Sequence, residues 1–98
     1  MSLADLIVAD ARLCILKELS LQTDGRLNEV GLQHVLDLFG IKRSRDWVRT
    51  QLRALDELGA VRIAEIGTVF VASLTKLGRD HVDLRAVIEG VSRPADED

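Results

Sequence analysis

The sequence is poor in several residue types, and each shortage excludes some kind of structure. It contains one cysteine, one proline and no tyrosine, and its large aromatic side chains are Phe39, Trp47 and Phe70 alone. Because Cys14 has no second cysteine in the chain, an intrachain disulfide is excluded. Hydrophobic residues still make up 47% of the 98 residues. We therefore expect one small domain with an aliphatic core, in which Cys14 is a packed thiol.

Membrane and export segments are also missing. No apolar run approaches the roughly 20 residues that a membrane helix needs. The opening MSLAD has no basic start of the kind that begins a signal peptide. We therefore expect a soluble, cytoplasmic protein with no membrane partner. Its formal net charge of −3 is not that of a generic nucleic-acid binder, although segregated charge can hide a basic surface.

Signals for catalysis and for metals are absent as well. His34 and His81 stand alone, outside spacings such as HxxxH or CxxC, so we expect them at the surface or at the edge of the core. No glycine-rich phosphate loop follows a predicted strand, and no local signature marks a nucleophile. The sequence predicts no enzyme, no metal, no cofactor and no small-molecule ligand.

Helix caps and turn residues predict a single domain over residues 1–90. Ser2, Asn28, Ser44 and Thr75 are good N-caps, and Gly40 and Gly59 can end helices in a left-handed conformation. Short β-branched runs around Gly67-Thr68 predict a hairpin. We expect a mainly α fold with a small β-hairpin wing, in the order α-α-α-β-β-α, with an acidic, disordered tail at 91–98. The expected helices are 2–21, 28–39, 44–58 and 75–89, the expected strands are 61–66 and 69–74, and a short extra strand is possible near Arg26.

The apolar positions of these helices predict how they pack. Helix 44–58 carries one stripe at Val48, Leu52, Leu55 and Leu58, with Trp47 at its edge. Helix 28–39 has its apolar positions at Val30, Leu32, Val35, Leu36 and Phe39, and Ile41 would anchor the following turn. Helix 2–21 has two apolar stripes, and one of them needs a partner beyond the core. That second stripe could be covered by the C-terminal helix or by another subunit, and we predict a homodimer through these two helices.

Basic residues gather at one place in the otherwise acidic chain. Residues 42–53 include five bases and one acid, Asp46. Guanidinium groups suit phosphates and guanine edges, and the second helix of a helix-turn-helix motif reads the DNA major groove. The same charges could instead form only a solvated helix face. The candidate DNA contacts are Ser44, Arg45 and Arg49 for base edges or nearby phosphates, Lys42, Arg43 and Arg53 for the backbone, and Arg62 and Thr68 for a flanking phosphate.

With these elements placed, the chain resembles the winged helix-turn-helix superfamily of bacterial regulators. The resemblance rests on the pattern from Ile41 through Ser44 and Val48 to Gly59-Ala60-Val61, and on Leu74-Thr75-x-x-Gly78-Arg79 after the hairpin. An LTxxGR phrase at this place is common in MarR-, PadR- and ArsR-like regulators. The chain lacks the metal-binding cysteines of ArsR-type sensors.

A narrower resemblance is to small winged-helix proteins of Mu-like phages and prophages. It rests on the opening LADLIVADARLCILKEL and the ending GVSRP. Together the resemblances imply a sequence-specific protein that binds double-stranded DNA and regulates transcription. The alternative is a winged-helix module that binds another protein and no DNA.

Overall fold

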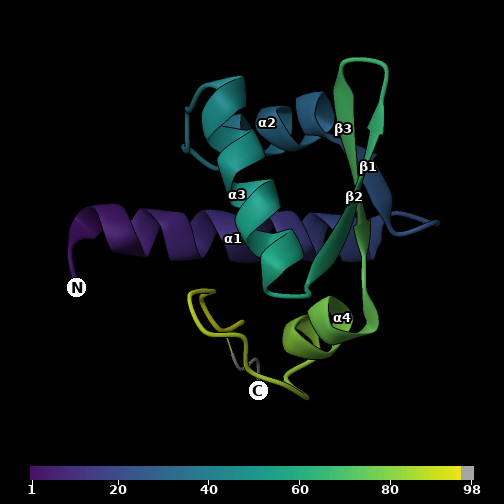
Figure 1. The fold of residues 1–98 in the computed structure, drawn as a ribbon. Coiled ribbons are helices and arrows are strands. Elements are labelled where there is room, and N and C mark those ends of the chain that lie inside the picture. Colours follow the sequence, from purple (N-terminus) through teal and green to yellow (C-terminus); the bar gives the residue numbers. More distant parts are fainter. Residues whose placement is uncertain (96–98) are drawn as a thin grey trace.

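The computed structural model describes residues 1–95, which form four helices and one antiparallel sheet of three strands (Figure 1). In this view α1 runs along the width of the molecule, with α2 and most of the hairpin on one side of it and α4 on the other. The elements are α1 (Leu3–Leu21), β1 (Arg26–Asn28), α2 (Glu29–Leu38), α3 (Arg45–Glu57), β2 (Val61–Ile66), β3 (Val69–Leu74) and α4 (Lys76–Val82).

The helices begin where the sequence predicts. Ser2, Asn28, Ser44 and Thr75 are the four N-caps, and each side chain accepts a hydrogen bond from the backbone N–H three residues later. These bonds satisfy N–H groups that a helix cannot pair internally. Gly59, with a φ of 81°, follows α3 and lets the chain reverse into β2.

The sheet has the strand order β1-β3-β2. β2 and β3 pair from Val61 with Leu74 to Ile66 with Val69, which leaves Gly67-Thr68 as the predicted two-residue turn. The short strand expected near Arg26 is present as β1, and it pairs with the other edge of β3. The hairpin is therefore part of a three-stranded sheet.

The core is aliphatic, as the composition predicts. The stripe of α3 is confirmed, because Val48, Leu52 and Leu55 are fully buried and Trp47 packs at the edge of the core. In α2, the expectation for Phe39 is wrong: its side chain is 71% exposed. The reason is that α2 ends at Leu38 and Phe39 is the C-cap, where the chain turns away from the helical path.

The end of the chain differs from its prediction. The last helix ends at Val82 and not near Glu89, because Leu84 has a φ of 63°, which no right-handed helix allows. His81 is fully buried, not at the surface or core edge, and its ring holds the segment that follows. Its Nδ1 accepts the N–H of Ile88 at 3.0 Å, and its Nε2 lies 2.9 Å from the carbonyl oxygen of Ser92.

The predicted disorder from residue 91 onward is also wrong at its start. Val91 is buried, and the backbone N–H of Ser92 donates to the carbonyl oxygen of Ala9 on α1 at 3.1 Å. The domain therefore extends past the expected boundary at residue 90. The acidic residues 96–98 of the predicted tail lie outside the described residues.

Close packing explains why the LTxxGR sequence has a glycine at position 78. A Cβ at this position would lie 2.2 Å from the carbonyl oxygen of Ala60. The Thr75 hydroxyl caps α4 and also donates to the carbonyl oxygen of Gly59. Thr75 and Gly78 together dock α4 against the start of β2.

Candidate functional site

The feature that organises the candidate site is a buried carboxylate at the start of α2. Glu29 is the first residue of α2 and is fully buried. Its Oε1 accepts hydrogen bonds from Arg45 Nε at 2.5 Å and from Arg49 Nε at 2.6 Å, and its Oε2 accepts the backbone N–H of Phe70 at 2.5 Å. One side chain thus joins α2, α3 and β3.

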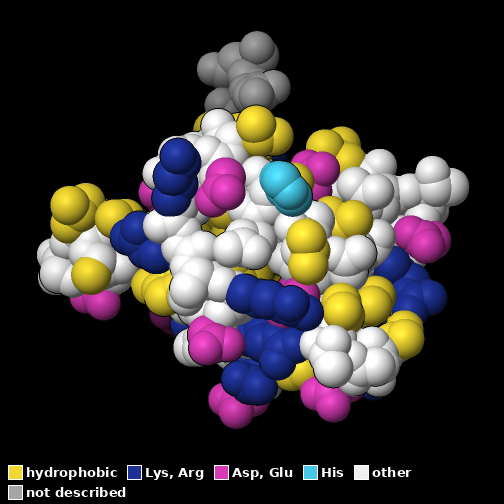
Figure 2. Space-filling view, turned by 90° about the horizontal axis from the view of Figure 1, so that it is seen from above, with side chains coloured by type: hydrophobic (Ala, Val, Ile, Leu, Met, Phe, Trp, Pro, Cys, Tyr) yellow, Lys and Arg dark blue, Asp and Glu magenta, His cyan; other side chains and the backbone are white. Residues whose placement is uncertain are grey.

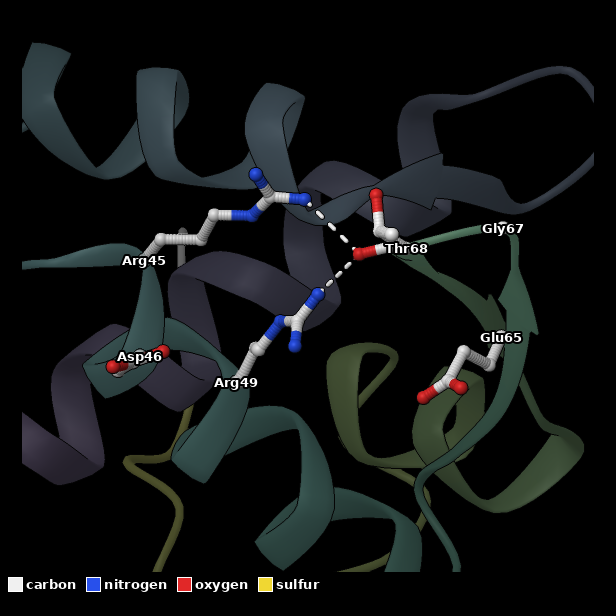
Figure 3. A pocket seen from close by; sticks show the side chains of 6 residues that line it. All are labelled: Arg45, Asp46, Arg49, Glu65, Gly67 and Thr68. Carbon is white, nitrogen blue, oxygen red and sulfur yellow. Dashed lines mark hydrogen bonds between the residues drawn. The ribbon is translucent and has the colours of Figure 1, made fainter.

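The two arginines also bind the hairpin turn. Nη2 of Arg45 donates to the carbonyl oxygen of Thr68 at 3.2 Å, and Nη2 of Arg49 donates to the same oxygen (Figure 3). In Figure 3 the two guanidinium groups converge on this carbonyl from α3. The hairpin tip is therefore held against the first turns of α3 by two charged donors.

Burial alone would raise the pKa of Glu29, because a carboxylate loses its hydration inside a protein. The hydrogen bonds from Arg49, Arg45 and the Phe70 N–H outweigh burial and lower the pKa to about 2. Hydrogen bonding to Glu29 likewise raises the pKa of Arg49. Glu29 and Arg49 are therefore both ionised at neutral pH.

Three of the arginines also contact aromatic rings. The guanidinium carbons of Arg49 and Arg53 lie 4.4 Å and 5.0 Å from the centre of the Phe70 ring, and that of Arg43 lies 5.5 Å from the Trp47 ring. These are cation–π distances. Such contacts, with the bonds to Glu29, restrict the side chains of an arginine-rich surface before any ligand binds.

The predicted site residues do not all lie together. Arg45, Arg49 and Thr68 are brought together, and Lys42, Arg43, Ser44 and Arg53 lie exposed on or just before α3. Arg62 does not join them, because it pairs with Ser73 five residues before Gly67, about 16 Å along the strand. The hydroxyl of Ser44 accepts the N–H of Trp47 as the helix cap.

An open groove of about 450 Å³ lies between α3 and the hairpin tip. Its lining includes two acids that sequence reasoning left out of the site, Asp46 and Glu65, beside Arg45 and Arg49. Figure 2 shows Lys and Arg side chains next to one another on this side of the molecule, with Asp and Glu at the borders of the group. The surface is basic at its centre and mixed in charge at its edges.

Glu29 and Phe70 also belong to the site, although the sequence did not predict them there. An acid in the first turn of a helix is common, because it is stabilised by the helix dipole, so Glu29 gave no separate signal. Phe70 fits a buried strand position equally well. Glu29 and Phe70 become parts of the site only because α3 and the hairpin pack against each other and against the start of α2 in the folded chain.

Within residues 1–95, no His, Cys, Asp and Glu side chains gather in a group of three or more that could hold a metal ion. In the same range, no helix is long and apolar enough to span a membrane.

The chain is similar to a phage protein. It is 38% identical over 90 residues to "Uncharacterized protein gp26" of Escherichia phage Mu, which covers 92% of this chain and 93% of the phage protein. The chain belongs to the family of this phage Mu protein. It is also 40% identical over 77 residues to an "Uncharacterized protein" of Haemophilus influenzae strain Rd, covering 78% of this chain and 74% of that protein.

The phage Mu relative confirms the predicted likeness to proteins of Mu-like phages. No protein-family model matches the chain. No solved structure matches it either.

Proposed function

We propose that the protein is a winged helix-turn-helix DNA-binding protein that places α3 in the major groove of double-stranded DNA and regulates transcription of a phage or prophage. The element order supports this proposal. A short connection at 39–44 joins α2 to α3, and the β2–β3 hairpin stands beside the start of α3, where the wing of such a module would lie (Figure 1).

The observation that carries the proposal is the clamp of Glu29 on Arg45 and Arg49. Both arginines lie at the start of α3, one turn apart, which is where a recognition helix contacts base edges. Each uses Nε and Nη2 inside the protein, while Nη1 makes no hydrogen bond within the described residues. A side chain that is already fixed loses less rotamer entropy when it binds a ligand. The bonds to Glu29 therefore favour ligand binding through the Nη1 atoms of Arg45 and Arg49.

The residues around the clamp fit contacts to the phosphate backbone. Lys42, Arg43 and Arg53 are exposed beside the start and along the face of α3. Phosphate contacts position a protein on DNA, whereas base contacts specify the sequence. We assign Lys42, Arg43 and Arg53 to phosphates, and Arg45 and Arg49 to bases or the phosphates next to them.

A second function has one observation in its favour. Asp46 and Glu65 line the same groove as the two arginines, and carboxylates repel phosphates. A protein surface that carries both signs of charge would fit such a groove better than DNA does. In this alternative the protein is an interaction module.

A titration against DNA separates the two proposals. Duplexes enriched from a random library by the immobilised protein are labelled, and binding is followed by fluorescence anisotropy at ~50 mM salt, where phosphate attraction is strong. Enrichment of a shared sequence, with binding weakened by Arg53→Ala but not by Arg85→Ala, supports DNA binding. Arg85 is a matched control, because it is an exposed arginine after α4. No enrichment and no binding would overturn the proposal.

A further inference from the structure

The face of α1 that points away from the core is largely apolar. Its side chains include Leu3 and Leu21, which are 73% and 77% exposed, and Leu6, which is 44% exposed. On the other side of the helix Arg12 points inward, where its Nε donates to Gln51 Oε1 and its Nη1 to the carbonyl oxygen of Gly90. Figures 1 and 2 show that the N-terminal half of α1 projects from the body with hydrophobic side chains on it.

A groove of about 450 Å³ follows this face. Ile7, Leu13 and Cys14 form its floor along α1, and Phe39 and Ile41 form a wall from the turn between α2 and α3. Phe39 is 71% exposed here, which is unusual for a phenylalanine and leaves its ring available to a partner.

The positions of the charged residues on this face indicate which kind of partner it binds. Asp10 and Lys17 lie on it, seven residues apart, which is two helical turns or about 10 Å. Glu18, at its edge, accepts a hydrogen bond from Gln22. The groove lining therefore holds two acids and one base, and Asp10 and Lys17 lie evenly about the middle of its apolar stretch.

Two copies of this face of α1 place opposite charges together only when the two helices run antiparallel. In an antiparallel pair related by a two-fold axis near residues 13 and 14, Asp10 faces Lys17 of the second copy, and Lys17 faces its Asp10. The same register sets Leu6 opposite Leu21 and Leu13 opposite Cys14. In a parallel pair, Asp10 would face Asp10 and Lys17 would face Lys17, so that like charges meet. The pattern is therefore self-complementary in the antiparallel arrangement.

We propose that this face of α1 is the docking site for the same face of a second copy of the chain, with the two helices antiparallel and Asp10 paired with Lys17 in both directions. The interface is isologous, as in most homodimers. It replaces the surface expected from the sequence, in which the C-terminal helix was to contribute, because α4 ends at Val82 and the chain after it packs on its own α1. This proposal is independent of the proposed DNA binding.

Charge exchange tests this proposal in the full chain. Sedimentation equilibrium should give twice 10.8 kDa for the unchanged protein. Asp10→Lys and Lys17→Asp should each weaken the dimer about tenfold or more, because each puts two like-charged pairs into the interface. An equimolar mixture of the two variants should restore it, since opposite charges then face each other in both places.

Two further variants keep the test decisive. Asp10→Lys also removes the bond from the Ser92 hydroxyl, so its fold is checked by circular dichroism. Leu21→Glu should prevent dimers without touching that bond, whereas Leu38→Glu, at an 85% exposed leucine on α2 outside the groove, should not. A monomer at tens of micromolar, or a dimer that Lys17→Asp and Leu21→Glu leave unchanged, would overturn the proposal. DNA binding by a monomeric variant to one half-site would remain measurable, so the two proposals can fail separately.

Discussion

Arg49 on α3 donates its Nε–H to the carboxylate of Glu29 on α2 at 2.6 Å, although the two residues are twenty positions apart in the sequence. The side chain of Arg49 is 23% exposed and that of Glu29 is fully buried. The pair thus connects a surface that could meet a ligand to the first turn of another helix. Its energetic role can be measured independently of any function.

Replacing Glu29 with alanine should destabilise the protein by about 3 kcal/mol. The substitution leaves the Phe70 N–H and two guanidinium edges without their acceptor. Urea unfolding followed by circular dichroism measures the change. Asp37→Ala, which removes an exposed acid from the same helix, is the control and should change stability little. Equal stability of the two variants would contradict the clamp.

The stability of the protein should fall as the pH drops from about 4.5 to about 2. The pKa of Glu29 is lower in the folded state than in the unfolded chain, so its contribution is complete above the unfolded pKa and is lost as the pH falls through the folded one. The difference corresponds to about 2–3 kcal/mol, after allowance for the solvent exposure of the arginines. Urea unfolding across this range should show a steeper loss for the unchanged protein than for Glu29→Gln. Parallel curves would show that Glu29 is not the titrating group.

Local rules predicted most of the fold. Ser2, Asn28, Ser44 and Thr75 cap their helices through bonds within four residues, and such contacts depend on short-range sequence. The end of the chain could not be predicted in this way. Leu77, Val82 and Leu84 suggest a helix that continues, but the buried ring of His81 provides a competing acceptor for the Ile88 N–H, and Leu84 adopts a left-handed conformation.

For the candidate site, the sequence predicted the position of the arginines but not what holds them. Arg45 and Arg49 follow from the spacing on α3. Their acceptors, Glu29 and the Thr68 carbonyl, come from α2 and the hairpin, and only tertiary packing brings these together. Long-range polar contacts have no signal in a single sequence, since Glu29 is equally consistent with an exposed first-turn acid.

Gly78→Ala should destabilise the protein by about 2 kcal/mol. Alanine is the better helix former by about 1 kcal/mol, but its Cβ would lie 2.2 Å from the Ala60 carbonyl oxygen, and backbone must move to admit it. Thermal unfolding followed by circular dichroism measures the change. Lys76→Ala, at an exposed position of the same helix, is the control. A stability gain for Gly78→Ala would contradict the close packing of α4 on β2.

His81→Leu should loosen the segment after α4. The ring accepts the Ile88 N–H at Nδ1, so its proton is on Nε2, which donates to the Ser92 carbonyl oxygen. Without these bonds the Ile88 amide should exchange with solvent about tenfold faster or more, as a buried bond is worth roughly 1–3 kcal/mol. Hydrogen exchange followed by NMR gives the rate. His34→Leu changes an exposed histidine and should leave this rate as it was.

The salt dependence of DNA binding shows whether α3 binds DNA through phosphate and base contacts. Affinity for an enriched duplex and for a scrambled one is measured over a range of salt concentrations. We expect Lys42→Ala to weaken binding to both duplexes alike and to lower the salt slope by about one, because one phosphate contact is lost. Arg49→Ala should cost ~1–3 kcal/mol on the enriched duplex and reduce its advantage over the scrambled one. If neither duplex is retained at ~50 mM salt and neither substitution has an effect, DNA binding is contradicted and the exposed face of α3 would instead bind a protein partner.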